Sequence, residues 1–127
     1  MNPAGSSESL MSGADYRESL RRYKPTVFVD GRRVDSVADE PAFAPGINAV
    51  GLTYDYALDE RYRKLMTALQ GTSGKLVNRM LHIDESSSDL LNKLEAVRLV
   101  CQETGCAQRY LAHDGLAALG QMAQRMD

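Results

Sequence analysis

The feature that most constrains the fold of this chain is a pair of apolar stripes at helical spacing in its last third, separated by one glycine. Leu90, Leu94, Val97 and Cys101 recur at intervals of four, three and four residues, the spacing at which one face of a helix is buried on a core. Gly105 follows this stripe. A second stripe then consists of Leu111, Ala118, Leu119, Met122 and Met126. We expect a helix with Gly105 as its C-cap, a tight turn, and a second helix that begins near Cys106 or Ala107.

The turn between the two stripes gathers four chemically active side chains. Cys106 supplies a thiol, Arg109 a guanidinium, Tyr110 a phenol and His113 an imidazole. A turn that joins two core-facing helices presents its polar groups on the surface, and loops often hold binding and catalytic residues. The segment from 104 to 114 is therefore the first candidate for function.

Length and composition are those of an ordinary globular domain. The 127 residues fit one domain, and a formal net charge of -2 gives no electrostatic basis for binding nucleic acid. No signal peptide and no apolar run of membrane length is recognisable. The spacing of Cys101 and Cys106 matches no zinc motif. We expect a soluble, cytoplasmic chain without a nucleic-acid or membrane partner, in which Cys101 is a small core residue.

Local signals predict the elements of the first half. Residues 1–10 are mostly small and polar, as is typical of a disordered tail. Ser12, with Asp15 three residues later, predicts a capping box, and Lys24-Pro25 ends the helix that it opens. The apolar face of that helix would consist of Tyr16, Leu20 and Tyr23. Asp30-Gly31, between two β-prone runs, favours a type I′ hairpin turn.

Local signals also predict the elements in the middle of the chain. Pro41 and Pro45 predict an irregular connector over 37–46, after which helical spacing runs from Ile47 to Leu58. Asp59-Glu60 opens a further short helix. The apolar face of this short helix would consist of Tyr62, Leu65, Met66 and Leu69. An extended segment is expected near 76–83, and the long helix begins at 86–89. The fold class is thus mainly α, with one short β-hairpin.

Three further features suggest binding but have simpler explanations. Arg32 and Arg33 beside the hairpin turn are typical of a solvated face. The loop from Gln70 to Lys75 superficially resembles a phosphate-binding loop, but leucine follows the lysine where serine or threonine is needed. His82 lies in an apolar segment, where a histidine is most often a structural residue with its hydrogen bonds satisfied.

Several segments, in order and spacing, resemble one known family. The start of the chain at 11–20, the hairpin Val-Asp-Gly-Arg-Arg-Val-Asp at 29–35 and Pro-Ala-Phe-Ala-Pro-Gly-Ile-Asn-Ala-Val at 41–50 are similar to the N-terminal domain shared by 4-hydroxyphenylacetate 3-monooxygenase and 4-hydroxybutyryl-CoA dehydratase. The likeness continues at 52–55, 65–68, 78–79, 82–83, 88–90 and 104–109. It spans roughly residues 11–127.

The resemblance implies a fold like that of acyl-CoA dehydrogenases, in which a helical N-terminal domain precedes a middle β domain and a C-terminal helical bundle. Residues 11–127 correspond to the first of these, and the other two are absent from the sequence. The implied cofactor is reduced FAD, held mainly by the later domains, so no flavin-binding residue is assigned here. The implied partners are the remaining domains or a partner subunit, a flavin reductase, and further copies in a homo-oligomer of the complete enzyme.

The resemblance implies different roles for the 104–114 segment in the two branches of the family. In the monooxygenase branch an arginine, matched here by Arg109, and an aromatic hydroxyl four residues later grip a phenolic substrate. His113 stands at that later position and could move the hydroxyl proton, while Tyr110 could supply a hydroxyl from a shifted place. In the dehydratase branch two cysteines four residues apart help to hold an iron–sulfur cluster. Cys106 matches the first, but Tyr110 replaces the second, so a cluster is not expected.

These implications lead to three hypotheses. The main one is the N-terminal portion of a two-component aromatic hydroxylase that uses reduced FAD and oxygen, with Arg109 and Tyr110 binding substrate and His113 catalytic. An alternative within the family is a dehydratase or isomerase of the 4-hydroxybutyryl-CoA type. The third is a non-catalytic fragment or assembly subunit, because apolar helix faces would stay exposed without the other domains. Whether the chain by itself is an enzyme is left open.

Overall fold

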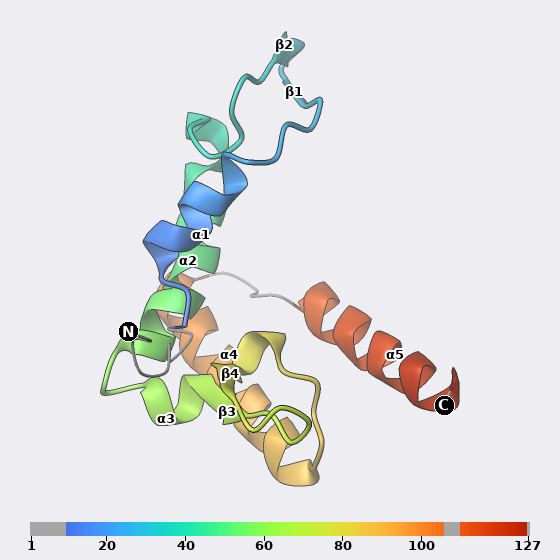
Figure 1. The fold of residues 1–127 in the computed structure, drawn as a ribbon. Helices are drawn as coiled ribbons and strands as arrows, with labels where there is room; N and C mark the ends of the chain where they lie inside the picture. The colour runs from blue at the N-terminus through green and yellow to red at the C-terminus, as the bar shows by residue number, and fades with distance from the viewer. Residues whose placement is uncertain (1–9, 106–109, 127) are drawn as a thin grey trace, which may run out of the picture.

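The chain folds into an elongated, mainly helical structure (Figure 1), given by a computed structural model that describes residues 10–105 and 110–126, at 110–114 as backbone only. In chain order the elements are α1 (Gly13–Leu20), β1 (Phe28–Val29), β2 (Arg32–Arg33), η1 (Pro41–Phe43), α2 (Ala44–Leu58), α3 (Arg63–Met66), β3 (Thr67–Leu69), β4 (Leu76–Asn78), η2 (Arg79–Leu81), α4 (Ser87–Thr104) and α5 (Tyr110–Met126). The notation η marks a short 3₁₀ helix. The mainly α fold class predicted from the sequence is confirmed.

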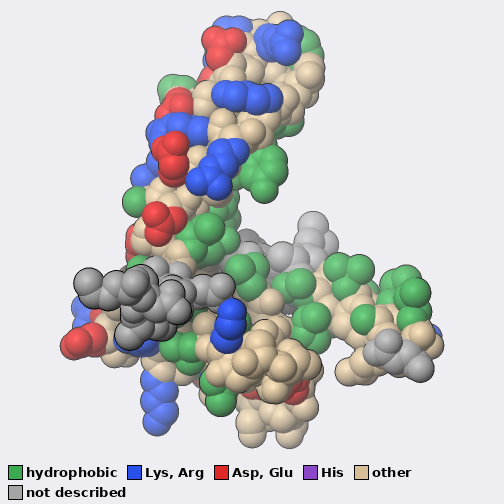
Figure 2. Space-filling model, in the orientation of Figure 1, with side chains coloured by type: hydrophobic (Ala, Val, Ile, Leu, Met, Phe, Trp, Pro, Cys, Tyr) green, Lys and Arg blue, Asp and Glu red, His purple; other side chains and the backbone are tan. Residues whose placement is uncertain are grey.

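Helices α1 and α2 pack side by side into an arm that leads to the β1–β2 hairpin (Figure 1). The predicted capping box is present, because the Ser12 hydroxyl accepts from the Asp15 N–H and the Asp15 carboxylate accepts from the Ser12 N–H. Gly13 allows a close approach: its N–H donates to Asp55 Oδ1 over 2.8 Å. The rings of Tyr16 and Tyr54 stack with centroids 5.0 Å apart. Charged side chains of both signs cover the visible face of this arm (Figure 2).

The tip of the arm is the predicted hairpin. Strands β1 and β2 pair antiparallel, with Val29 opposite Arg32, and the turn residues Asp30 and Gly31 both have positive φ angles, 49° and 76°. This is the backbone geometry that a type I′ turn requires. Arg32 pairs with Glu40 across 2.9 Å while its own side chain stays 62% exposed, which confirms the prediction of a solvated arginine.

The core lies at the other end of the molecule, in a body built from the end of α2, α3, β3–β4 and α4. Its buried members are Ala57, Met66, Met80, Ala96, Val97 and Val100. Leu10 and Cys101 are half-buried and pack against this cluster. The remaining nine residues of the predicted N-terminal tail lie outside the described part of the chain. No described helix is both long and apolar enough to cross a membrane.

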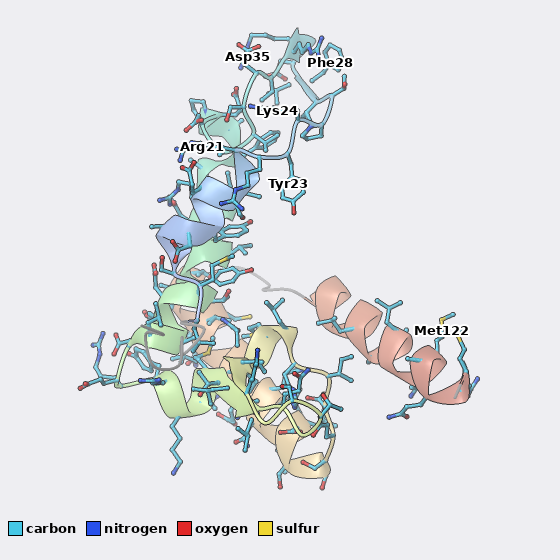
Figure 3. All side chains as sticks on the ribbon, in the orientation of Figure 1. Arg21, Tyr23, Lys24, Phe28, Asp35 and Met122 are labelled. Atoms are coloured by element: carbon cyan, nitrogen blue, oxygen red, sulfur yellow. The ribbon has the colours of Figure 1, made fainter. Side chains whose placement is uncertain are left out.

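The structure corrects three of the predicted elements. Helix α1 ends at Leu20, and Tyr23, expected on its buried face, is 68% exposed beside the end of this helix (Figure 3). The connector over 37–46 is shorter than predicted, because α2 begins at Ala44 with Pro45 in its first turn. Proline is well tolerated there, since the first helical N–H groups have no partner within the helix.

The short helix predicted after Asp59 is also wrong over its second half. It covers only Arg63–Met66, and Thr67–Leu69 form a strand that pairs antiparallel with Leu76–Asn78. The loop that superficially resembled a phosphate site is the turn of this second hairpin. It is closed by a hydrogen bond from Gln70 N–H to the Lys75 carbonyl and by Gly74 at φ 66°. The described residues therefore form two short hairpins, where the sequence predicted one.

From Ala118 onward, the second apolar stripe is not covered by the described residues. On α5, Leu119, Met122 and Met126 are 61%, 60% and 84% exposed, although the spacing predicted a core-facing helix. Hydrophobic side chains line the visible face of α5 (Figure 2), and Met122 extends away from the body (Figure 3). Within 115–126 the buried residue is Gly120, where the helix meets the loop after η2.

Candidate functional site

Helix α4 leads directly to the predicted functional turn. It begins at an N-cap, where Ser86 Oγ accepts from the Asp89 N–H over 3.1 Å. It ends at Gly105, which has φ 66° and ψ 18° and donates its N–H to the Cys101 carbonyl over 2.9 Å. A left-handed residue after the last helical turn is the usual glycine C-cap. The prediction that Gly105 ends the first apolar stripe is confirmed.

The reactive residues themselves are placed only in part. Cys106 and Arg109 lie outside the described residues. Tyr110 and His113 belong to the first turns of α5, where the backbone is described from Tyr110 onward. The roles inferred for these four residues therefore stay predictions, and so does the inferred absence of a cluster at Cys106.

A buried ion cluster, which we define as Arg79, His82, Asp84, Asp89 and Lys93, holds the start of α4 to the rest of the body. Arg79 is central to it. Its Nε donates to the Leu65 carbonyl and its Nη2 to the Thr67 carbonyl, each over 2.6 Å, and its side chain is 7% exposed. Nη1 lies 3.5 Å from Asp89 Oδ1. One guanidinium thus connects α3 and β3 to α4.

The other members of the buried ion cluster fix the loop between η2 and α4. His82 is 1% exposed, and its Nε2 lies 3.1 Å from Asp89 Oδ2. Lys93 Nζ donates to the His82 carbonyl and also lies 3.0 Å from Asp84 Oδ1. The loop is therefore held on both sides of Ile83. His82 is buried and bonded to Asp89 as a structural residue would be, but the prediction that its hydrogen bonds are satisfied holds only in part, because its buried Nδ1 has no hydrogen-bond partner among the described residues.

The carboxylate of Asp89 is stabilised in its charged form. The Glu85 N–H donates to its Oδ2 over 2.9 Å, and this bond is the main cause that lowers the pKa of Asp89 below the ordinary value of 3.8. Partial burial opposes the shift, while His82 and Arg79 reinforce it. Asp89 is consequently ionised at neutral pH and counters the buried positive charge beside it.

A cavity of about 340 Å³ lies between the buried ion cluster and α5. From the body it is lined by Ile83, Asp84, Leu90 and Lys93, and from α5 by Ala117, Gly120, Gln121 and Gln124. The lining is therefore mixed, with an ammonium–carboxylate pair and two glutamine amides among the apolar side chains. Two more cavities, of about 360 and 270 Å³, lie beside Cys101 on α4 and between Asn48 of α2 and Thr104.

These cavities do not fit a flavin, and the described residues hold no metal site. Pockets that hold drug-sized ligands have volumes of about 300–1,000 Å³. A dinucleotide such as FAD is larger than most such ligands and needs more space than any of these three cavities offers. Among the residues that the structure describes, no three His, Cys, Asp or Glu side chains lie close enough to hold a metal ion.

Sequence reasoning missed the buried charges. Arg79 lies in the segment predicted to be extended and was not singled out, and neither was Lys93, although both are more than nine-tenths buried. Lysine and arginine are rarely buried unless they are paired. One feature of the sequence could have indicated this burial. Two basic and two acidic residues lie close together around the apolar residues of the η2–α4 loop, namely Arg79, Asp84, Asp89 and Lys93.

Comparison with known proteins finds, over nearly the whole chain, the family that the sequence resembles. Residues 12–127 match the family described as 4-hydroxyphenylacetate 3-hydroxylase N terminal. The chain is 34% identical over 119 residues to 4-hydroxybutyryl-CoA dehydratase/vinylacetyl-CoA-Δ-isomerase of Clostridium aminobutyricum, covering 93% of this chain and 24% of that protein. It is 27% identical over 88 residues to the oxygenase component of 4-hydroxyphenylacetate 3-monooxygenase of Thermus thermophilus, covering 69% and 18%.

Solved structures show the same two kinds of relative. An oxygen-tolerant archaeal 4-hydroxybutyryl-CoA dehydratase from N. maritimus superposes with a TM-score of 0.83 at 39% identity, over 94% of this chain and 24% of that chain. The oxygenase component of a 4-hydroxyphenylacetate 3-monooxygenase, solved with FAD and 4-hydroxyphenylacetate, gives 0.62 at 26% identity, over 73% and 19%. The chain thus spans about a quarter or less of the length of these relatives.

Proposed function

Since the chain belongs to the 4-hydroxyphenylacetate 3-hydroxylase N-terminal family, we propose that it is the N-terminal portion of a flavin-dependent enzyme that hydroxylates a phenolic compound with reduced FAD and oxygen. The family contains both oxygenases and dehydratases. The observation that carries the proposal is Tyr110, which stands four residues after Cys106 where cluster chemistry of the dehydratase type needs a second cysteine. A phenol is a poor ligand for iron–sulfur chemistry compared with a thiolate.

In this proposal, the residues after Gly105 bind and orient the substrate. The guanidinium of Arg109 attracts the phenolic oxygen and favours the phenolate, which is the more electron-rich ring. The imidazole of His113 takes or gives the hydroxyl proton near neutral pH, and Tyr110 adds a hydroxyl for hydrogen bonding. The C-cap at Gly105 supports this arrangement, because it ends α4 where these residues begin.

The flavin in this proposal is bound by polypeptide other than the described residues. The chain matches only 24% of the dehydratase and 18% of the oxygenase component. A relative solved with FAD shows that members of the family bind this cofactor. We propose that the remaining domains, or a partner subunit, hold FAD, that a separate reductase reduces it, and that the complete enzyme is a cytoplasmic homo-oligomer.

A second candidate is favoured by overall similarity. The chain is more similar to the dehydratase structure, with a TM-score of 0.83 against 0.62 for the oxygenase component, and shares 39% against 26% of its residues. This supports an activity on a 4-hydroxyacyl-CoA thioester, with Cys106 as an iron ligand. The two candidates differ in one measurable respect, since the dehydratase type requires a cluster of about four irons.

The test uses the assembly that contains this chain, isolated without oxygen. We expect less than one iron per chain, and oxygen-dependent hydroxylation of 4-hydroxyphenylacetate when reduced FAD is supplied. Replacement Arg109→Ala should raise KM for the phenol roughly 10- to 150-fold, the equivalent of one lost charge-assisted hydrogen bond. Arg98→Ala, on the exposed face of α4, is the matched control and should leave KM unchanged.

The other outcomes decide against the main proposal or against the role it gives to Arg109. About four irons per chain with dehydration of 4-hydroxybutyryl-CoA would establish the second candidate. An unchanged KM in Arg109→Ala would remove Arg109 from the substrate site. No turnover of either substrate, with the flavin bound, would favour a non-catalytic assembly module.

A further inference from the structure

Helix α5 has an apolar face that the described residues of the body do not cover. Its large side chains, Leu119, Met122 and Met126, are each more than half exposed. A Cβ atom built on Gly115 of the same face would meet nothing within 4 Å. Hydrophobic side chains line the visible face of the helix (Figure 2), and Met122 extends away from the body (Figure 3). We call these four residues the α5 seam. A contiguous apolar surface of this kind marks an interaction site.

The spacing of the α5 seam is that of a helix that pairs with another helix. Its members follow one another at intervals of four, three and four residues, which are the a and d positions of a coiled coil. Gly120, which is buried beside Ile83, lies about 130° around the helix from the middle of the seam. One face of α5 can therefore contact the body while the seam contacts a second helix.

The order of residues along the α5 seam makes it complementary to itself. In an antiparallel pair with a two-fold axis level with residues 120 and 121, Met126 of each copy lies opposite Gly115 of the other. Leu119 of each copy then lies opposite Met122 of the other. Every layer combines side chains that together fill the space between the helices. A parallel pair would instead place glycine opposite glycine and leave a void.

The charge on α5 favours the same orientation. Arg125 is the one charged residue in the sequence from 115 to 126, so the α5 seam itself carries no charge. In the antiparallel pair residue 125 is level with residue 116 of the other copy, which separates the two arginines by roughly 14 Å along the axis. Salt screens most of their repulsion at that distance, since the Debye length is about 8 Å. In a parallel pair the two guanidinium groups would lie side by side.

We propose that a second copy of this chain docks on the α5 seam, through an antiparallel pair of α5 helices. With 17 residues α5 is roughly 25 Å long, and one helix face of that length buries less than the about 1,200 Å² of a stable complex. The association is therefore weak and reversible, with an expected dissociation constant of about 10–100 µM. The pairing gives the homo-oligomer of the proposed function an interface, and rests on that function in this respect alone.

Sedimentation equilibrium of the purified chain, from about 1 µM to about 1 mM, measures the association. Leu119→Glu puts an unpaired carboxylate into each central layer and should weaken association at least about tenfold. Gln124→Glu is the matched control, because it adds the same charge at an exposed position about 170° around the helix from the middle of the seam. It should leave association unchanged, and circular dichroism checks that both variants are folded. A chain that stays monomeric at the highest concentration, or equal association of the two variants, would overturn the proposal.

Disulfide cross-linking tests the orientation, in a chain whose own cysteines are replaced by Cys101→Ala and Cys106→Ser. Gly115→Cys and Met126→Cys, oxidised separately, should not cross-link, because equal positions lie roughly 16 Å apart in the antiparallel pair. A mixture of the two variants should form a dimer linked between unlike chains. Cross-linking of each variant to itself, or none in the mixture, would overturn the antiparallel pair.

The assembly with bound flavin separates this inference from the proposed function. The mixed cysteine variants should cross-link there as they do in the chain alone. A cross-link in the chain alone and none in the assembly would show that other polypeptide covers the α5 seam, and would overturn the second copy as its occupant. Hydroxylation that depends on Arg109 would stand in that case. An assembly that cross-links but does not hydroxylate would overturn the function and leave the pairing in place.

Discussion

Replacing Arg79 by methionine tests how much the buried ion cluster contributes to stability. The substitution keeps much of the side-chain volume but removes the donors to the Leu65 and Thr67 carbonyls, both bonded over 2.6 Å. It also leaves Asp89 without the guanidinium that lies 3.5 Å from its Oδ1. Methionine cannot satisfy any of these groups, so the change isolates the polar role of Arg79.

The expected magnitude follows from the burial. Because the arginine side chain is 7% exposed, little discount for solvent screening applies. Each hydrogen bond from a charged donor contributes about 1.5–3 kcal/mol, and breaking a buried pair costs about 3–5 kcal/mol in total. Domains are stable by only about 5–15 kcal/mol. We expect Arg79→Met to lower the free energy of unfolding by about 3–5 kcal/mol, a large part of the whole.

Urea unfolding at pH 7, followed by circular dichroism, measures this loss. The matched control is Arg98→Met on the same body, where Arg98 pairs with Glu95 across 3.3 Å but both side chains are at least 60% exposed. An exposed pair of this kind contributes about 0–1 kcal/mol. Arg79→Lys keeps the charge but not the fork of donors, and should fall between the two. A loss below about 1 kcal/mol in Arg79→Met would refute the view that Arg79 joins α3, β3 and α4.

Two further predictions concern the pH dependence of stability and the packing of α1 on α2 in the arm. Because the pKa of Asp89 is lowered in the folded state, its charged form stabilises the fold above about pH 4, and this contribution is lost as the pH falls from the ordinary value of 3.8 through the folded value. Urea midpoints between pH 7 and 3 should therefore fall less steeply in Asp89→Asn than in the original chain, and parallel curves would contradict the shift. On the arm, Gly13→Ala would place a Cβ atom 2.7 Å from Asp55 Oδ2, and we expect a loss of about 1–3 kcal/mol from overpacking. Gly46→Ala in the first turn of α2, with nothing within 4 Å, is its control, and equal effects of the two changes on thermal unfolding would refute the close packing of α1 on α2.

The sequence predicted best those features that a few neighbouring residues decide. The capping box of Ser12 and Asp15, the turn at Asp30-Gly31 and the C-cap at Gly105 each depend on side-chain or backbone chemistry within four positions. The structure has all three. Local rules suffice here because each element end must satisfy its own backbone groups.

The sequence did not predict the elements whose structure depends on residues far away along the chain. Leu69 continues the apolar spacing of a helix, but its segment pairs with the strand at Leu76–Asn78, and the carbonyl of Thr67 in that segment accepts from Arg79. The burial of Lys93 likewise depends on His82 and Asp84, which only the tertiary fold brings to it. Periodicity reports which face of an element is apolar, and cannot report which charges meet across it.

The candidate site likewise has features that the local sequence predicts and features that depend on residues elsewhere. Residue types and spacing pointed to the segment after Gly105, and the family was found from the order of several short segments. The roles of Arg109, Tyr110 and His113 came from the resemblance, not from the spacing. The exposed stripe on α5 was predicted as a core face, because a sequence pattern does not say whether the surface that covers it belongs to the same domain.

We propose that this chain is one part of a flavoenzyme and does not bind the flavin by itself. The most direct test is a fluorescence titration with oxidised and reduced FAD, on the purified chain and on the chain mixed with the product of the adjoining reading frame. We predict tight binding of FAD in the mixture and none to the chain alone. Tight binding to the chain alone, or none in either case, would contradict the claim.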